Sequence, residues 1–407
     1  MDKNQKALVT LLNMAIRNTK LSSVDFSDVD FDAVYNEAAA HQVHTLIYPS
    51  VKEFVSVQKI DSQLMSKWRK TALLFGIQQT ENCEKIKHVF AAFLEAGIPV
   101  IALKGLVIRD LYPHPELRTM SDADILVQKN DLDKAKNILI NMGFEVYDIT
   151  HKHISFVHKS YPSIELHWSL ITDKLGSLAA SFENVLWQNS QHSPVCGFDS
   201  LIPSVDDHIF YLLLHMAGHY ISNGFGLRQL CDIVLFTESH YDAIDWNLFK
   251  SRSIDYRVKN FVYSVFLVCH KLFNLKFPPI FDYNAQFNNE FIDIFIDDIF
   301  SGGVYGHKTA ARSIGNALVK DSKGRHNNKF TGIAKYYLTL FFPPLRSLND
   351  KYAYAKKYPV LIPIAWIHRL IYGIRRKDFS FSEKSSMLVS SPVISQQRAE
   401  LLHWLDL

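Results

Sequence analysis

The stretch VIALKGLVIRDLYPHPELRTMSDADILV, residues 100–127, decides the fold together with SIELHW at residues 163–168. Each segment contains short apolar runs that are typical of buried strands. A glycine and several charged residues stand where these runs begin or end. The stretch therefore predicts a small core of strands and helices with one polar site at its edge.

The first apolar run ends at a Lys-Gly pair. Residues 100–103 are apolar and β-rich, and Lys104 and Gly105 separate them from LVIRDLY, whose apolar residues recur at helical spacing. A glycine at such a turn lets the backbone approach a ligand, and the unpaired N–H groups of the helix favour an anion. Lys104 adds a positive charge. Because strand, glycine and helix also form ordinary connectors, this signal alone leaves a structural turn open.

Two aspartates precede the next apolar run. In SDADILV, the letters ILV indicate a strand that is entered directly from Asp122 and Asp124. Side chains two positions apart on a strand point to the same face, so both carboxylates reach one small volume. Like charges this close are unfavourable without a cation between them, and oxygen ligands suit Mg²⁺ or Mn²⁺. An isolated D-x-D is more often a solvated turn before a strand.

A third acidic residue lies in the strand SIELHW. Strict alternation places Ile164 and Leu166 on the buried face, with Glu165 and His167 on the other. The preceding run ISFVHK indicates the partner strand of a hairpin. Three carboxylates without a cysteine fit a two-metal phosphoryl-transfer centre better than a zinc site. Taken alone, Glu165 is an exposed strand residue.

The ordered set LKG, RTMSDADILV, AKNILINMGF and IELHW resembles the DNA polymerase β-like nucleotidyltransferase superfamily, and most closely its branch of uncharacterised bacterial nucleotidyltransferase family proteins. The resemblance implies an α+β fold, in which a small mixed β-sheet core is flanked by N-terminal and C-terminal helical domains. It implies that Gly105 is the phosphate-turn glycine, that Asp122 and Asp124 bind the metals, and that Glu165 completes the site. Lys104-Gly105 followed by leucine departs from the Gly-Ser or Gly-Gly turn of the superfamily, and the closer branch carries this form.

Further side chains are candidates for nucleotide binding. Ser121 immediately precedes the aspartate pair. Arg118 either neutralises phosphate charge or ties the loop to the core, and both roles stay open. Arg228 lies in the helical region after the core, and its guanidinium suits phosphate geometry. His215 and His219 stand one helical turn apart, where a packed pair is favoured and lining of the substrate cleft is the alternative.

Composition is that of an ordinary globular protein. The 407 residues, 48% of them hydrophobic, suffice for two or three domains with a sizeable core. A net charge of +3 does not by itself indicate nucleic acid. The four cysteines lack CxxC spacing, which predicts free thiols in a reducing compartment. Without a signal-peptide pattern or an apolar run long enough to span a bilayer, we expect a cytoplasmic protein.

Periodicity divides the chain into four regions. We expect an N-terminal helical region at 1–97, the nucleotidyltransferase core at 98–205, a C-terminal helical domain at 206–377, and a serine-rich linker with a terminal helix at 378–407. The polar, basic run at 311–330 is expected to be an exposed connector.

Residues 351–377 are aromatic and basic, and they contain no Asp or Glu. Such a segment suits peripheral contact with an anionic membrane surface, or contact with nucleic acid. The alternative that we favour modestly is a helical pair whose apolar face closes the C-terminal domain while its basic face is solvated.

The motifs and the resemblance together predict a Mg²⁺-dependent nucleotidyltransferase, with Mn²⁺ as the alternative metal. It would move a nucleoside monophosphate from a nucleoside triphosphate, with ATP the expected donor, to a hydroxyl acceptor and release pyrophosphate. A small molecule or a protein is the expected acceptor, and nucleic acid is less favoured because the chain is close to neutral. The rival interpretations are an inactive binding scaffold with the same fold and an RNA-directed transferase.

Overall fold

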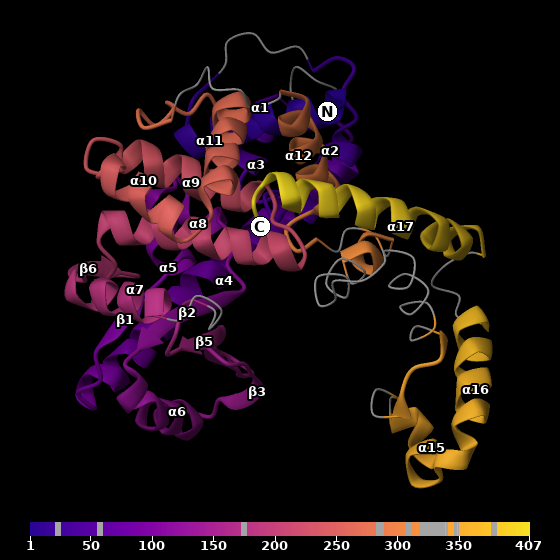
Figure 1. Cartoon of the computed structure of the whole chain (residues 1–407). Coiled ribbons are helices and arrows are strands. Elements are labelled where there is room, and N and C mark those ends of the chain that lie inside the picture. The colour runs from indigo at the N-terminus through magenta and orange to yellow at the C-terminus, as the bar shows by residue number, and fades with distance from the viewer. Residues whose placement is uncertain are drawn as a thin grey trace.

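The computed structural model describes residues 1–20, 26–54, 60–171, 177–281, 289–306, 311–316, 350–375 and 381–407, with short pieces between 307 and 349. Helices occupy both ends of the described chain, and one mixed sheet lies between them in the sequence (Figure 1). The predicted fold class, a small mixed-sheet core flanked by helices, is therefore confirmed.

Four helices precede the sheet, and aspartates begin three of them. Asp2 accepts a hydrogen bond from the backbone N–H of Gln5, whose side chain accepts one from the backbone of Asp2. Asp30 and Asp61 cap the second and fourth helices through their carboxylates. Gly97 has a φ of 68° and follows the end of the fourth helix, where glycine adopts the left-handed conformation easily. The helices are α1 Lys3–Arg17, α2 Phe31–Ala40, α3 Tyr48–Phe54 and α4 Ser62–Glu95.

Seven strands form one sheet in the order β3-β4-β5-β2-β1-β7-β6. β2 pairs in parallel with β5, and β1 with β7, while the other neighbours are antiparallel. The predicted hairpin is confirmed as β4 and β5. The strands are β1 Val100–Ala102, β2 Asp122–Val127, β3 Glu145–Ile149, β4 His153–Val157, β5 Ser163–His167, β6 Gln191–Val195 and β7 Phe198–Ile202.

Different helices cover the two faces of the sheet. Ile125 of β2 and Ile164 of β5 join one apolar cluster with Phe93 of α4 and with α6, Leu132–Asn141. Leu126 points the other way and joins a larger cluster built by the helices at both ends of the chain. Because both faces are covered, His167 is only 1% exposed although it lies on the face opposite Ile164.

Helices that follow β5 in the sequence contribute most of the residues of the larger cluster. They are α7 Ser177–Gln188, which lies between β5 and β6, and then α8 Val205–Ser222, α9 Leu227–His240, α10 Trp246–Asp255, α11 Lys259–Phe273 and α12 Asn289–Gly302. Among the described residues, no helix combines the length and the apolar character that crossing a membrane requires.

Three helices follow the sparsely described segment between 307 and 349. α15 Ala353–Lys357 and α16 Ile362–Arg375 stand apart from the rest of the described molecule in Figure 1 and enclose their own small apolar cluster. α17 Phe381–Trp404 returns to the main body and packs on α12. Short helical turns connect these and earlier elements, namely α5 Gly105–Ile108, η1 Arg109–Leu111, η2 Pro115–Leu117, η3 Lys129–Asp131, η6 Asp350–Tyr352 and η7 Pro359–Leu361.

Local structure departs from the sequence predictions in three places. The hairpin of β6 and β7 is not indicated by any of the sequence motifs, and it closes where Cys196 and Gly197 take left-handed conformations that suit a two-residue turn. The helix expected in LVIRDLY is divided into α5 and η1. The serine-rich linker expected from 378 is instead largely helical, because α17 is anchored by buried residues such as Arg398 and Leu401. Most of the connector expected at 311–330 lies outside the described residues.

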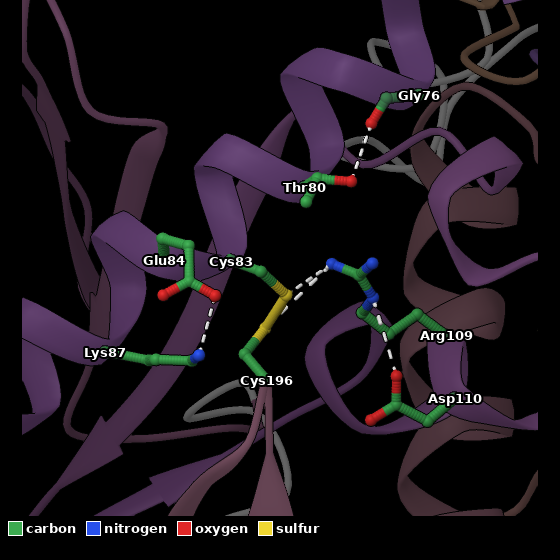
Figure 2. The surroundings of a disulfide bond; sticks show 8 residues. All are labelled: Gly76, Thr80, Cys83, Glu84, Lys87, Arg109, Asp110 and Cys196. Carbon is green, nitrogen blue, oxygen red and sulfur yellow. Dashed lines mark hydrogen bonds and ion pairs between the residues drawn. A yellow bond between two sulfur atoms is a disulfide. The ribbon is translucent and has the colours of Figure 1, made fainter.

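A disulfide joins Cys83 of α4 to Cys196 in the turn between β6 and β7 (Figure 2). The guanidinium of Arg109 contacts the sulfur of Cys83 and also pairs with Asp110. The prediction of four free thiols is therefore wrong for this pair. The two cysteines are 113 positions apart in the sequence, and only the packing of α4 on the sheet brings them together.

Candidate active site

Three carboxylates from β2 and β5 lie together on one face of the sheet. Asp122 and Asp124 alternate along β2, and the parallel register places Glu165 directly opposite Asp124. One oxygen atom from each carboxylate lies within 4.8 Å of the others. Asp124 is buried, whereas Asp122 and Glu165 are half-buried. The structure thus assembles the three residues that the sequence singles out, and their role as metal ligands stays a prediction.

Asp124 already carries two strong contacts. The ammonium of Lys104 lies 2.6 Å from Oδ1 of Asp124, and Nε2 of His167 lies 2.9 Å from the same oxygen. Burial raises the pKa of Asp124, but the Lys104 charge and the His167 hydrogen bond outweigh burial and hold this pKa well below its usual range. Asp124 raises the pKa of Lys104 in turn, against the effect of burial. Lys104 therefore acts as an internal counter-ion at the centre of the carboxylate group.

Backbone strain accompanies this contact. Lys104 has a φ of 48° and a ψ of −121°, a conformation that side chains other than glycine rarely adopt. Gly105 follows it in tight packing, because a Cβ there would lie 2.8 Å from Nη1 of Arg118 and 3.3 Å from Sδ of Met120. The structure therefore gives Gly105 a packing role, and its contact with phosphate stays a prediction.

His167 links two of the three carboxylates. Its Nε2 lies 2.9 Å from Oδ1 of Asp124 and 3.3 Å from Oε2 of Glu165. Burial raises the pKa of Glu165, but the hydrogen bond from His167 outweighs burial, so that the pKa lies below its usual value. The ring of His153 lies beside that of His167 at an interplanar angle of 53°, and Nε2 of His153 lies 3.8 Å from Oε1 of Glu165. These contacts fix the orientation of both carboxylates.

Asp122 is held less firmly than its neighbours. Burial first, and the nearby Asp124 charge second, raise the pKa of Asp122. The hydroxyl of Ser121 donates to Oδ1 of Asp122 at 3.1 Å, and the hydroxyl of Tyr305 lies 3.4 Å from Ser121. Ser121 is thus placed beside the carboxylates, where the sequence predicts a contact with nucleotide.

A cavity of about 290 Å³ opens beside the three carboxylates and is bordered mainly by α8 and α9 on the other side. Lys152 lines the cavity from the turn between β3 and β4. The pKa of Lys152 is lowered, mainly by burial and further by the charge of Lys104. The sequence analysis missed Lys152 because no motif surrounds it. The basic side chains and imidazoles that line the cavity are Lys104, Arg118, Lys152, His153, His167, His215, His219 and Arg228.

Of the two roles left open for Arg118, the structure shows the structural one. Nε and Nη2 of Arg118 donate to the two oxygens of Asp232 in α9, at 2.8 and 2.7 Å. The hydroxyl of Tyr112 also donates to Asp232, at 2.8 Å. Arg118 is 4% exposed, so the pair ties the loop before β2 to α9 from within. Arg118 also lines the cavity, so its contact with phosphate stays a prediction.

Arg228 and the histidine pair line the wall opposite the carboxylates. Nη1 of Arg228 donates to the side chain of Gln42 and to the carbonyl oxygen of Thr119, each at 2.9 Å. The Nε2 atoms of His215 and His219 lie 3.2 Å apart, so the pair is packed and also borders the cavity. Burial first, then the charge of Lys104, lowers the pKa of His219 to about 4, so that its ring is neutral near pH 7.

Known proteins resemble this chain at two levels. No curated protein matches it significantly. A solution structure of the antibiotic-resistance factor ANT(2'')-Ia is 13% identical, covers 42% of this chain and 92% of its own, and gives a TM-score of 0.33. The apo form of a tRNA-processing enzyme is 12% identical, covers 79% of this chain and 98% of its own, and gives a TM-score of 0.27. Likenesses this weak carry no inference. At the family level the match is direct: the family described as uncharacterised nucleotidyltransferase matches residues 27–274, more than half of the chain. The chain therefore belongs to that family.

Proposed function

We propose that the chain transfers a nucleoside monophosphate from a nucleoside triphosphate, with ATP the first candidate, to a hydroxyl acceptor and releases pyrophosphate. The observation that carries this proposal is the group formed by Asp122, Asp124 and Glu165 beside a cavity with several basic side chains. Membership of a nucleotidyltransferase family supports it independently. A cytoplasmic location stays a prediction.

The carboxylate group fits a hard divalent cation. Its three oxygen atoms lie within 4.8 Å of one another, and the set contains no sulfur ligand. Asp122, Asp124 and Glu165 would hold Mg²⁺, with Mn²⁺ as the alternative. A bound cation would neutralise the charge that develops on phosphate and lower the pKa of a bound hydroxyl.

Basic side chains around the cavity would receive the triphosphate. Lys104 and Lys152 approach from the sheet, and Arg228 from α9. Arg228 is already oriented by Gln42 and the Thr119 carbonyl, so little side-chain entropy is lost when it meets a phosphate oxygen. Three cationic groups would offset much of the charge of a triphosphate and position its phosphate chain beside the carboxylates.

The acceptor is proposed to be a small molecule or a protein side chain. The cavity of about 290 Å³ is close to the lower end of the size range of ordinary ligand pockets. The two neutral histidines add no charge to its far wall, where Arg228 is the basic side chain. A net charge of +3 over 407 residues keeps nucleic acid the less favoured acceptor.

Calorimetric titration of the four nucleoside triphosphates into the full chain, with and without Mg²⁺, tests the proposal. We expect one triphosphate to bind only with metal. The Asp122→Asn, Asp124→Asn double variant keeps the side-chain shape but removes both charges, so we expect metal-dependent binding to weaken by more than about 100-fold. Release of pyrophosphate during incubation with candidate hydroxyl compounds then identifies the acceptor.

The matched control removes two exposed aspartates from the same core. Asp133→Asn, Asp148→Asn changes the net charge by the same amount but lies outside the cavity, so it should leave binding unchanged. If no triphosphate binds the intact chain, the catalytic proposal fails and an inactive scaffold becomes the better interpretation. A strong salt dependence of RNA binding would instead favour an RNA-directed transferase.

A further inference from the structure

The segment formed by Tyr358, η7 and α16, which stands apart from the main body, exposes an apolar surface. Ile364, Ile367 and Ile371 follow one another at helical spacing along α16, and their exposed fractions are 56%, 58% and 45%. Val360 of η7 is 89% exposed just before them, and Tyr358 is 56% exposed. We call these five residues the apolar stripe.

The opposite side of α16 supplies the packing of this arm. Ala365 is fully buried, and the indole N–H of Trp366 donates to the carbonyl oxygen of Pro343 at 2.9 Å. On the flank of the helix, the exposed ring of His368 contacts the rings of Tyr352 and Tyr354. The described contacts of α16 are mainly with α15 and η7, so α16 packs within the arm and leaves the stripe exposed.

Basic residues flank the apolar stripe in the sequence. Residues 351–377 contain no Asp or Glu, whereas the whole chain has 41 acidic and 44 basic residues. Lys356 and Lys357 are exposed immediately before Tyr358, and Lys351 is exposed one turn earlier. The basic residues of the segment are Lys351, Lys356, Lys357, Arg369, Arg375, Arg376 and Lys377.

We propose that the arm formed by residues 351–375 docks on an anionic lipid surface, with the apolar stripe in the boundary between headgroups and acyl chains and the lysines on the lipid phosphates. Charge complementarity and the apolar stripe together support this proposal. α16 has 14 residues, so its length of roughly 21 Å is too short to cross the hydrocarbon core and suits a helix that lies in the surface plane. The proposal does not depend on the proposed transfer reaction.

A nucleic acid would satisfy the charge but not the stripe. Single strands bind through aromatic side chains on which the bases stack, whereas four of the five stripe residues, Ile364, Ile367, Ile371 and Val360, are aliphatic and only Tyr358 is aromatic. Aliphatic side chains gain free energy when they leave water for hydrocarbon. The lipid surface is therefore the partner that uses both features.

Flotation of the full chain with vesicles tests the proposal. We expect flotation with vesicles of phosphatidylcholine and phosphatidylglycerol, weaker flotation with phosphatidylcholine alone, and loss at high salt. Ile364→Asp should lower the partition coefficient by about tenfold or more, because burial of one isoleucine is lost. Neutralising Lys356 and Lys357 together as Gln should lower it by about 30-fold.

Leu74→Asp is the matched control, because Leu74 lies on α4 and is 56% exposed, as Ile364 is. It should leave flotation unchanged. The proposal is overturned if the intact chain floats with neither vesicle, or if Leu74→Asp reduces flotation as much as Ile364→Asp. It is also overturned if the arm variants weaken binding to single-stranded RNA, or halve the mass seen by light scattering, without an effect on flotation.

Discussion

Lys104 occupies the position at Asp124 that a metal ion would share. Its ammonium lies 2.6 Å from Oδ1 of Asp124, and the carboxylates of Asp122 and Glu165 are close by. An internal cation competes with an external one for the same negative charge. We therefore expect Lys104 to lower the affinity for a metal and to raise the affinity for a nucleotide.

Replacing Lys104 by methionine separates the two effects. Lys104→Met keeps the length of the side chain and removes its charge, so we expect the affinity for Mn²⁺ without nucleotide to rise by about tenfold. Metal-dependent affinity for the triphosphate should fall, because the proposed contact of Lys104 with phosphate is lost. Electron paramagnetic resonance of free Mn²⁺ measures the first effect and calorimetry the second. Lys134→Met, at an exposed site outside the cavity, should change neither.

His208 of α8 makes the stability of the chain depend on pH. Its side chain is 1% exposed, and burial first, then the neighbouring His240, lowers its pKa to about 3. The unfolded chain binds this proton near pH 6.5, so it holds more protons than the folded chain between pH 6.5 and 3. The free energy of unfolding therefore decreases as the pH falls through this window.

The variant His208→Leu removes this titration. We expect its free energy of unfolding to fall less than that of the intact chain between pH 7 and pH 5, by about 2 kcal/mol for one fully buried group. Urea denaturation at a series of pH values measures both curves. If the free energy of unfolding of both proteins changed equally with pH, the prediction would be contradicted, because His208 would then bind its proton equally well in the folded chain.

At the level of residues, short motifs were enough to predict the acidic group. Asp122, Asp124 and Glu165 lie in strands, where alternation fixes which face each side chain takes. Lys152 and Tyr305 could not be found this way, because loops and distant helices bring them to the cavity. The partner of Arg118 is 114 positions away in the sequence, so only the fold could show its structural role.

At the level of elements, a buried ion group attaches α17 to the main body. Arg398 donates to Oδ2 of Asp298 in α12 at 3.0 Å and to the carbonyl oxygen of Tyr220 in α8 at 2.6 Å. Arg312 pairs with the same aspartate. Arg398 is 1% exposed, and breaking a buried pair leaves an unfavourable charge or an unpaired carbonyl group.

Loss of Arg398 should therefore release the C-terminal helix. We expect Arg398→Leu to lower the free energy of unfolding by about 3–5 kcal/mol and to make α17 the first site of limited proteolysis. Gln397→Leu changes an exposed neighbour on the same helix and should stay within about 0.5 kcal/mol of the intact chain. Equal proteolysis of both variants would contradict the role of the ion group.

Elements with strong periodicity were predictable, and those held by distant contacts were not. α1, α4 and α6 follow amphipathic patterns with clear ends. α17 has almost no amphipathic pattern and contains Pro392, so serine-rich composition suggested a linker. Its order depends on tertiary anchors such as Arg398, which no local pattern reveals. β6 and β7 are short strands whose place in the sheet depends on the distant pairing of β7 with β1.

At the scale of the whole molecule, the Cys83–Cys196 disulfide links the N-terminal helices to the far edge of the sheet. A crosslink across 113 positions restricts the unfolded chain, and the chain-entropy model gives about 4–5 kcal/mol for a loop of this length. We expect reductant to lower the free energy of unfolding by up to this amount. The Cys83→Ser, Cys196→Ser double variant should be insensitive to reductant, and equal stability of the intact chain with and without reductant would contradict the prediction.

The same crosslink gives the chain an unusual mechanical property. All three carboxylates lie between its two cysteines, inside a covalent loop that a force on the two termini cannot pull straight. In single-molecule stretching, the fully extended oxidised chain should be shorter than the reduced one by roughly 380 Å, at about 3.4 Å for each enclosed position. Tension that unravels both helical ends would thus leave the segment that carries the candidate site closed upon itself.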